Sequence, residues 1–133
     1  NEDFQKEIGH TRVSFWDCPL NKDYADRLRE DNLPLTEAKS ENRINRIAGT
    51  AQDPRQTERV PAGARFDFKL TIKEFDGDDK ALFDTLLQGL KLLEWDSLGG
   101  NGSRGYGKVA FTAITRNGED ISSCFAAIQP FAK

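Results

Sequence analysis

The sequence feature that most constrains the fold is a clean alternation of apolar and polar side chains that leads into an amphipathic segment. Residues 64–75 (ARFDFKLTIKEF) alternate along the chain, which predicts a β-strand with one buried face. The apolar positions of this strand are Phe66, Phe68, Leu70 and Ile72. Residues 80–95 then repeat leucine at helical spacing, which predicts a helix whose apolar stripe covers a sheet. Asp78 or Asp79 is available to cap the start of this helix, and Gly99 is placed to cap its end.

The rest of the chain supplies shorter predicted elements and one arm. Residues 11–18 have a β-type composition, and the highly charged residues 21–31 predict a short surface helix. Residues 37–60 contain few large apolar groups, so we expect a long arm or hairpin that leaves the body of the domain. Residues 108–116 predict a strand, which an Asn-Gly hairpin turn joins to a further strand over 120–128.

The order of these elements predicts an α+β fold. One long helix packed on an antiparallel sheet is an α+β sandwich. Compared with a ferredoxin-like β-α-β-β-α-β arrangement, the chain has everything except the first strand and the first helix. It begins at Asn1 and contains no methionine, so we expect a chain that lacks its N-terminal part. At 133 residues, a single domain is expected.

The charge of the chain is unevenly distributed. The net charge of −3 gives no overall attraction to nucleic acid. Between Lys39 and Arg65, however, six basic residues stand against three acidic ones, which leaves a local excess of +3. This excess indicates a localised contact with an anion, and a solvated charged loop is the alternative.

Cysteine and histidine usage argues against a zinc site. Cys18, Cys124 and the single His10 lack the spacing of zinc ligands. One disulfide or two reduced cytosolic thiols are both open, and we expect the thiols. The apolar runs are all shorter than the roughly 18 residues that span a bilayer, so we expect no membrane contact.

Residues 98–109 (LGGNGSRGYGKV) concentrate five glycines in one loop. A phosphate-binding glycine run usually follows a strand and opens a helix, whereas this loop follows a helix, and Lys108 precedes valine rather than Ser or Thr. This order argues against a nucleotide P-loop. A simple turn needs fewer glycines, so we expect backbone amides to approach a bulky partner, with Arg104 and Lys108 supplying charge and Tyr106 a stacking face. A tightly packed connection from helix to strand is the alternative.

Three motifs, which follow one another along the chain in the order that the family has, resemble a known family. Residues 92–111 (LLEWDSLGGNGSRGYGKVAF) look like the C-terminal glycine-rich motif of the RAMP superfamily, the repeat-associated proteins that assemble CRISPR effector complexes. Residues 36–68 (TEAKSENRINRIAGTAQDPRQTERVPAGARFDF) are similar to the backbone subunit of the type III-A (Csm) effector complex. Residues 11–20 (TRVSFWDCPL) resemble a strand of the same family.

The resemblance implies a ferredoxin-like RAMP domain over residues 1–133, with residues 36–60 as a thumb-like insertion. It implies a protein of antiviral defence that coats CRISPR RNA as a filament. Family members clamp the guide backbone with the glycine loop and push the thumb between bases of the guide–target duplex. Carried onto this chain, the implied RNA-binding residues are Lys39, Arg43, Arg46, Arg55, Arg59, Gly99, Gly100, Gly102, Ser103, Arg104, Gly105, Tyr106, Gly107 and Lys108.

Two substitutions test these residues. Gly102→Val is expected to abolish guide binding because it blocks close approach of the loop to the guide backbone. Arg43→Ala combined with Arg46→Ala is expected to weaken RNA binding without changing the melting temperature, because the arm buries little surface.

The family also cuts target RNA, with an aspartate in the loop after its first strand, and nothing in this chain matches that region. We expect structural roles for Asp17 and Asp96, so no catalytic residue is assigned. No cofactor is expected in this chain, and a divalent metal is implied only for cleavage by the intact parent.

Two other classes of function stay open. One is a protein-interaction domain with no RNA role. The other is a stand-alone metal-dependent nuclease built on the carboxylates of Asp76, Asp78 and Asp79, for which a capped turn is the alternative.

The resemblance also implies partners. These are CRISPR RNA, target RNA, further copies of the same protein and other subunits of the effector complex, all in the cytoplasm. A sheet that lacks a strand leaves an exposed edge and an uncovered apolar face, which invites association with another copy.

Overall fold

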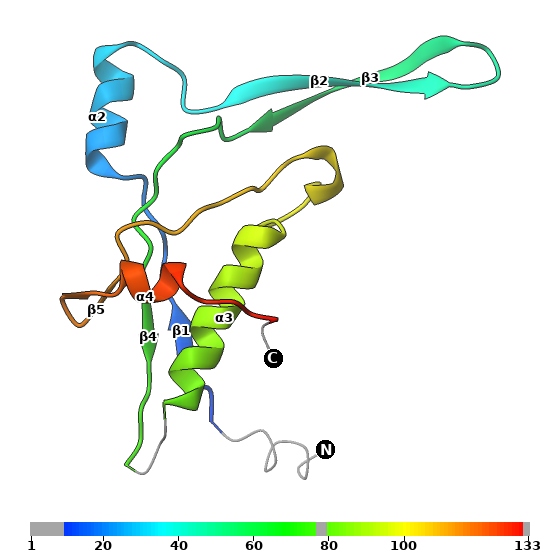
Figure 1. Cartoon of the computed structure of the whole chain (residues 1–133). Helices are drawn as coiled ribbons and strands as arrows, with labels where there is room; N and C mark the ends of the chain where they lie inside the picture. Colours follow the sequence, from blue (N-terminus) through cyan, green and yellow to red (C-terminus); the bar gives the residue numbers. More distant parts are fainter. Residues whose placement is uncertain (1–9, 77–79, 132–133) are drawn as a thin grey trace. The chain divides into compact units, whose positions relative to one another are not determined.

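The computed structural model describes residues 10–76 and 80–131, and the chain divides into two units, Asn1–Thr71 and Ile72–Lys133. The first unit contains strand β1, helix α2 and the β2–β3 hairpin (Figure 1). The second contains helix α3, the glycine loop, the small β5–β6 hairpin and helix α4. Strand β4 lies where the two units join. Short two-stranded pairs and helices give the α+β class that the sequence predicts.

Strand β1 (Val13–Phe15) pairs with strand β4 (Leu70–Ile72). Beyond the strands, an antiparallel bridge joins Leu20 to Phe66, and the Asp67 amide donates to the Pro19 carbonyl at 2.8 Å. The prediction of one regular strand over residues 64–75 is therefore wrong in extent. Proline has no amide hydrogen to give to a ladder, so the facing segment supports single bonds here rather than a continuous strand.

The predicted buried face of residues 64–75 is also largely open. Phe66 is 48% exposed and Phe68 is 39% exposed, whereas Leu70 and Ile72 are half-buried. An alternating pattern shows which side chains share a face, but the cover over that face must come from another element.

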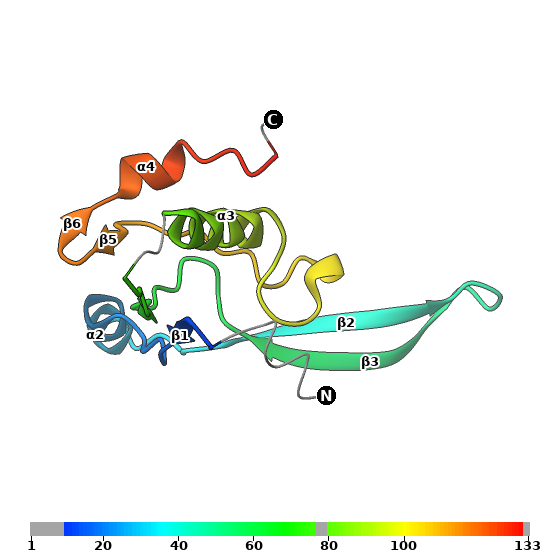
Figure 2. The same ribbon diagram turned by 90° about the horizontal axis from the view of Figure 1, so that it is seen from below.

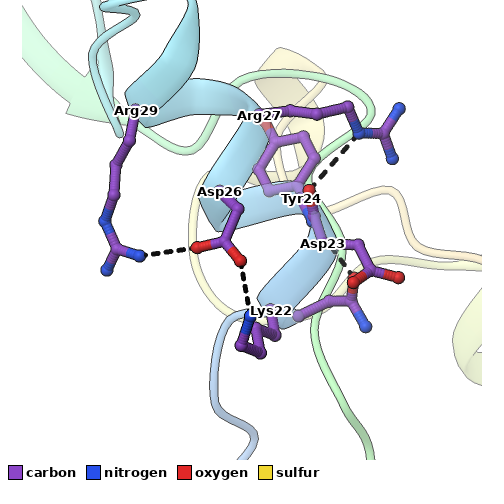
Figure 3. Close-up of polar contacts among 7 residues, drawn as sticks. Lys22, Asp23, Tyr24, Asp26, Arg27 and Arg29 are labelled. Atoms are coloured by element: carbon purple, nitrogen blue, oxygen red, sulfur yellow. Dashed lines mark hydrogen bonds and ion pairs between the residues drawn. The ribbon is translucent and has the colours of Figure 1, made fainter.

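Helix α2 (Lys22–Glu30) confirms the predicted surface helix. The side-chain oxygen of Asn21 caps its first turn by accepting a hydrogen bond from the Tyr24 amide at 3.2 Å. Leu28 is its buried residue. On the outer face, the Asp26 carboxylate lies between Lys22 and Arg29, at 2.7 and 2.8 Å (Figure 3).

The predicted arm is a long antiparallel hairpin of strands β2 (Glu37–Asn45) and β3 (Thr50–Arg59), which lie side by side in both views (Figures 1 and 2). The register runs from Glu37 opposite Arg59 to Asn45 opposite Thr50, with a bulge between Glu41 and Arg43. At the turn, the Asn45 side-chain oxygen accepts from the amides of the two turn residues Ile47 and Ala48, at 3.0 and 3.2 Å.

Helix α3 (Ala81–Trp95) confirms the predicted amphipathic helix. Leu87 and Leu90 are its buried residues. Asp78 and Asp79, the predicted caps, lie outside the described residues. The prediction of Gly99 as the terminal cap is wrong, because Asp96 is the C-cap and its amide donates to the Leu92 carbonyl at 3.0 Å.

The C-terminal region differs from the predicted pair of strands. Only Thr115–Arg116 (β5) and Glu119–Asp120 (β6) form strands, around the predicted Asn-Gly turn. Ala113 has φ 51°, a left-handed conformation that interrupts the extended run expected over residues 108–116.

The last predicted strand, over residues 120–128, is instead helix α4 (Ser122–Ala126). The Asp120 carboxylate accepts from the Ser122 amide at 2.8 Å and so satisfies a backbone donor where the helix begins. Phe125 of α4 is 3% exposed, and its ring meets that of Phe111 edge-on at 6.1 Å.

Cys18 and Cys124 are both free and exposed. Among the residues that the structure describes, no helix is long and apolar enough to cross a membrane.

Candidate nucleic-acid interface

The glycine loop is an ordered loop with a closed neck. The Leu98 amide donates to the Gly107 carbonyl at 2.8 Å and joins the two ends of the loop. Inside it, residues Gly102–Arg104 form one 3₁₀ turn, which backbone bonds from the amides of Arg104 and Gly105 close at 2.9 Å. The loop surface at residues 99–101 and 103–105 is exposed.

Three of the glycines are required by the backbone of the loop itself, and a fourth, Gly102, lies against a side chain. A Cβ on Gly107, whose φ is +73°, would lie 2.1 Å from the Leu98 carbonyl oxygen, and one on Gly102 would lie 2.2 Å from the Ser97 hydroxyl. Gly99 and Gly105 have φ of +80° and +79°, a region that L-residues with a side chain rarely adopt.

Gly100 is the exception among the five. Its φ lies outside the left-handed region and a Cβ there would have nothing within 4 Å. The sequence interpretation assigned all five glycines to close approach by a partner, and the loop's own geometry accounts for four of them. Gly102→Val consequently loses its value as a test of partner binding, because valine would collide with Ser97 in any case.

The two cations of the loop lie in different environments. Arg104 and Ser103 are exposed on the 3₁₀ turn, and Tyr106 is half-buried. The Lys108 ammonium group donates instead to the carbonyl oxygens of Trp95, at 3.2 Å, and of Asp96, at the end of α3. The structure therefore places Arg104 on the outer part of the loop and Lys108 at its neck.

The cations of the hairpin are also divided. Arg59 pairs with Glu37 at 2.6 Å, and Lys39 lies 3.5 Å from Glu41. Arg46 and Arg55 are exposed, Arg46 in the turn and Arg55 opposite Glu41 in the register. The side chain of Arg43 lies outside the described residues. Arg59 thus pairs across the hairpin with Glu37, which lies outside the segment whose charges the sequence interpretation summed, and Lys39 pairs along its strand with Glu41, which that sum included.

The hairpin tip is apolar, a feature that sequence analysis did not use. Ile47 is 99% exposed in the turn, and Ile44 is 68% exposed on the adjoining strand. Isolated exposed aliphatic side chains are common on proteins, but two at the end of an otherwise polar hairpin form a small apolar tip beside Arg46. The available indication in the sequence was the pair of isoleucines flanking the arginine in RINRI.

The remaining candidates are the carboxylates considered for metal binding or catalysis. Within residues 10–76 and 80–131, no group of three or more His, Cys, Asp or Glu side chains could hold a metal ion. Of the proposed carboxylate cluster, Asp78 and Asp79 lie outside the described residues. Asp17 is exposed, and Asp96 ends helix α3, where its carbonyl accepts from Lys108.

The groups with resolved pKa shifts belong neither to the glycine loop nor to the hairpin. Within the described part of the chain, the hydrogen bond and ion pair between Lys22 and Asp26 raise the pKa of the lysine and lower that of the carboxyl. Hydrogen bonds from Ser122 lower the pKa of Asp120.

These two surfaces, an ordered glycine loop after a long helix and a protruding basic hairpin, are those expected of the family that the sequence resembles. The RAMP superfamily model matches residues 5–110, and the chain belongs to this superfamily. Its α+β elements fit the ferredoxin-like fold of that class.

More specific similarity comes from three relatives, each described as "CRISPR system Cms endoribonuclease Csm3". The one from Streptococcus thermophilus is 51% identical over 109 residues, which cover 77% of this chain and 47% of that protein. The one from Methanothermobacter thermautotrophicus is 50% identical over 78 residues, covering 59% and 31%. The one from Mycobacterium tuberculosis is 41% identical over 118 residues, covering 77% and 49%. The chain therefore spans between about a third and a half of the length of these relatives.

Proposed function

We propose that this chain forms the guide-binding part of a backbone subunit in a type III CRISPR effector complex. The observation that carries the proposal is the ordered, exposed glycine loop, in which the chain's own geometry explains every glycine except Gly100. Family membership and the Csm3 relatives support the same function.

The loop would bind the sugar–phosphate backbone of the guide. The absence of a side chain at Gly100 leaves open space above the peptide, so a phosphate group can approach the amides of residues 99–101 closely. Arg104, exposed on the adjacent turn, would add a cation to the same face. A protein that holds RNA through its phosphates binds guides of any sequence, as a filament subunit must.

The hairpin would act on the base-paired guide and target. Ile47 and Ile44 give its tip an apolar surface suited to insertion against a base, while Arg46 and Arg55 can contact nearby phosphates. The ion pairs of Lys39 and Arg59 would serve the stiffness of the hairpin rather than phosphate binding.

We propose cleavage of target RNA only for the intact parent protein and not for this chain. The relatives are named endoribonucleases, and the resemblance places the family's catalytic aspartate in a region that this chain does not match. We therefore assign this chain the binding surfaces, and we assign cleavage with a divalent metal to the whole subunit. The partners would be CRISPR RNA, target RNA, other subunits and further copies of itself, in the cytoplasm.

An apolar surface of the first unit supports association between copies. Phe15 at the end of β1, Trp16 directly after it and Phe66 are 65%, 54% and 48% exposed. Large exposed aromatic side chains in one unit offer apolar surface for a protein contact. Neighbouring subunits of a filament would cover them.

The test is RNA binding by Gly100→Val over a range of salt concentrations, followed by fluorescence anisotropy of a labelled single-stranded RNA. We expect weaker binding with an unchanged melting temperature, because the new side chain meets only the partner. Arg104→Ala should lower the slope of log affinity against log salt by about 0.7, the value of one phosphate contact on single strands.

The matched control is Gly89→Ala on α3, at another glycine with nothing within 4 Å of its Cβ position. It should bind RNA as the unmodified chain does. Wild-type affinity in Gly100→Val, together with a flat salt response of the unmodified chain, would leave a protein-interaction domain as the better assignment.

A further inference from the structure

The neck of the glycine loop carries side-chain contacts that neither the family match nor the proposed function assigns. Besides the Leu98–Gly107 backbone bond, two side chains tie the segment after the loop to the last turn of α3. Lys108 donates to the carbonyl oxygens of Trp95 and Asp96. From the helix, the Glu94 carboxylate accepts from the Phe111 amide at 2.7 Å.

Lys108 supplies the positive charge that the C-terminal end of helix α3 lacks. The last carbonyl groups of a helix have no partners inside it and carry a partial negative charge. The last turn of α3 contains no basic residue of its own. The ammonium group of Lys108, thirteen residues beyond Trp95, meets this end from the far side of the loop. Lys108 is an exposed residue, and these two bonds hold its ammonium group at the helix end.

Glu94 forms the second tie, in a more enclosed place. Its side chain is 14% exposed, and its other oxygen lies 2.9 Å from the ammonium group of Lys91, which is 18% exposed. The Lys91 nitrogen also lies 4.8 Å from the centre of the Phe125 ring, in the core of this unit. The Glu94 carboxylate thus contacts the segment after the loop directly, and through Lys91 it is connected to Phe125 in the core.

These contacts differ in kind from an anion site. A phosphate ligand needs donors that are available to solvent, whereas two of the three N–H donors of the exposed Lys108 ammonium group are taken by carbonyl oxygens of its own chain. A loop held at its neck is ordered before a ligand arrives, so binding loses less conformational freedom.

We infer that Lys108 and Glu94 are positioning residues, which hold the glycine loop in its binding geometry, and that Lys108 is not a phosphate ligand. The inference rests on the proposed function for its consequence in RNA binding. Its structural part, the order of the loop, stands on the contacts alone.

The experiment compares Lys108→Met, Lys108→Arg, Glu94→Ala and Glu94→Gln by amide hydrogen exchange and by binding of the same labelled RNA over a salt series. Lys108→Met keeps an unbranched side chain but removes the charge. We expect the Leu98 amide to exchange about tenfold faster or more, as for a lost charge-assisted hydrogen bond. RNA affinity should fall several-fold with an unchanged salt slope, and Lys108→Arg should restore most of both.

Variants of Glu94 give a second, independent test. Glu94→Gln keeps an oxygen that can accept from the Phe111 amide, while Glu94→Ala leaves that amide without it. We therefore expect faster exchange at Phe111 and in the loop for the alanine variant, and near-normal exchange for the glutamine variant. Should Glu94→Ala fail to fold, Lys108→Met still decides the question.

Two results would overturn the inference. One is a salt slope that falls by about 0.7 in Lys108→Met while loop exchange stays normal, because that is the behaviour of a phosphate contact. The other is unchanged exchange in both Lys108→Met and Glu94→Ala. If the unmodified chain does not bind RNA at all, the proposed function fails, and the exchange data alone then support or overturn the positioning role.

Discussion

Replacing Gly107 by alanine should destabilise the second unit through one backbone contact. The φ of +73° at this position costs an ordinary L-residue about 1–2 kcal/mol. The new Cβ would also lie 2.1 Å from the Leu98 carbonyl oxygen and 3.0 Å from the Leu98 amide nitrogen, so the neck must open. Loss of the hydrogen bond from the Leu98 amide to the Gly107 carbonyl adds about 0.5–1.5 kcal/mol.

Together these effects lower the free energy of unfolding by about 1.5–3.5 kcal/mol. For a chain of this size, a loss of 1 kcal/mol corresponds to about 4 °C in melting temperature, so we expect a decrease of roughly 6–14 °C. Thermal unfolding followed by far-ultraviolet circular dichroism measures this decrease.

The matched control is Gly100→Ala in the same loop. With an ordinary φ and nothing within 4 Å, it should change the free energy of unfolding by at most about 0.5 kcal/mol. The reasoning is refuted if the two variants melt together, since the neck would then not require a glycine at Gly107.

Three further predictions follow from contacts elsewhere. Gly89→Ala, at an exposed position inside α3, should raise the free energy of unfolding by about 0.5–1 kcal/mol, and a lower denaturation midpoint in urea would contradict the open surroundings of that glycine. Asn21→Ala should cost about 1 kcal/mol because the Tyr24 amide loses its cap, whereas Asn21→Ser should keep most of the stability. The hydrogen bonds from Ser122 lower the pKa of Asp120 below its ordinary value of 3.8. They therefore stabilise the folded state above pH 3.8, and this stabilisation is lost as the pH falls through the lowered pKa. Ser122→Ala should bring the pKa of Asp120 closer to 3.8 in an NMR titration.

Local patterns predicted the helices and turns well. Helix α2 lies within the charged segment over residues 21–31, and α3 follows from leucine spacing. The turn at Asn117–Gly118, with φ of 51° and 89°, is the hairpin turn that this dipeptide favours. These elements depend on residues within a few positions of each other, which is why the sequence alone predicts them.

The strand predictions failed where strand formation depends on the segment that faces it. Within residues 64–75 the alternation continues as far as Lys73, yet Leu70–Ile72 is the part that forms a strand, because the facing segment contains a proline and few regular partners. Residues 122–126 became a helix because Asp120 satisfies the first backbone donor and Phe125 finds a buried place. Composition alone does not distinguish such a short helix from a strand.

The sequence also predicted the candidate site only in part. The sequence marked the glycine loop and the basic hairpin as surfaces, and both are exposed and ordered along the backbone. It did not predict that Lys108 turns to the end of α3, or that Lys39 and Arg59 find carboxylate partners across and along the hairpin. Counting charges gives only the net charge of a segment, whereas ion pairing depends on the strand register and on which side chains folding brings to the end of a helix.

The amino-acid sequence by itself determined the α+β class, both main helices, the hairpin arm and the family, because each of these is written in short-range spacing and in motifs. Only the tertiary structure decided which glycines serve the loop and which one is open to a partner, and which cations face solvent. Those properties depend on distances between residues brought together by folding, such as Gly107 and Leu98 or Lys108 and Trp95, and side-chain chemistry acts over those distances rather than along the chain.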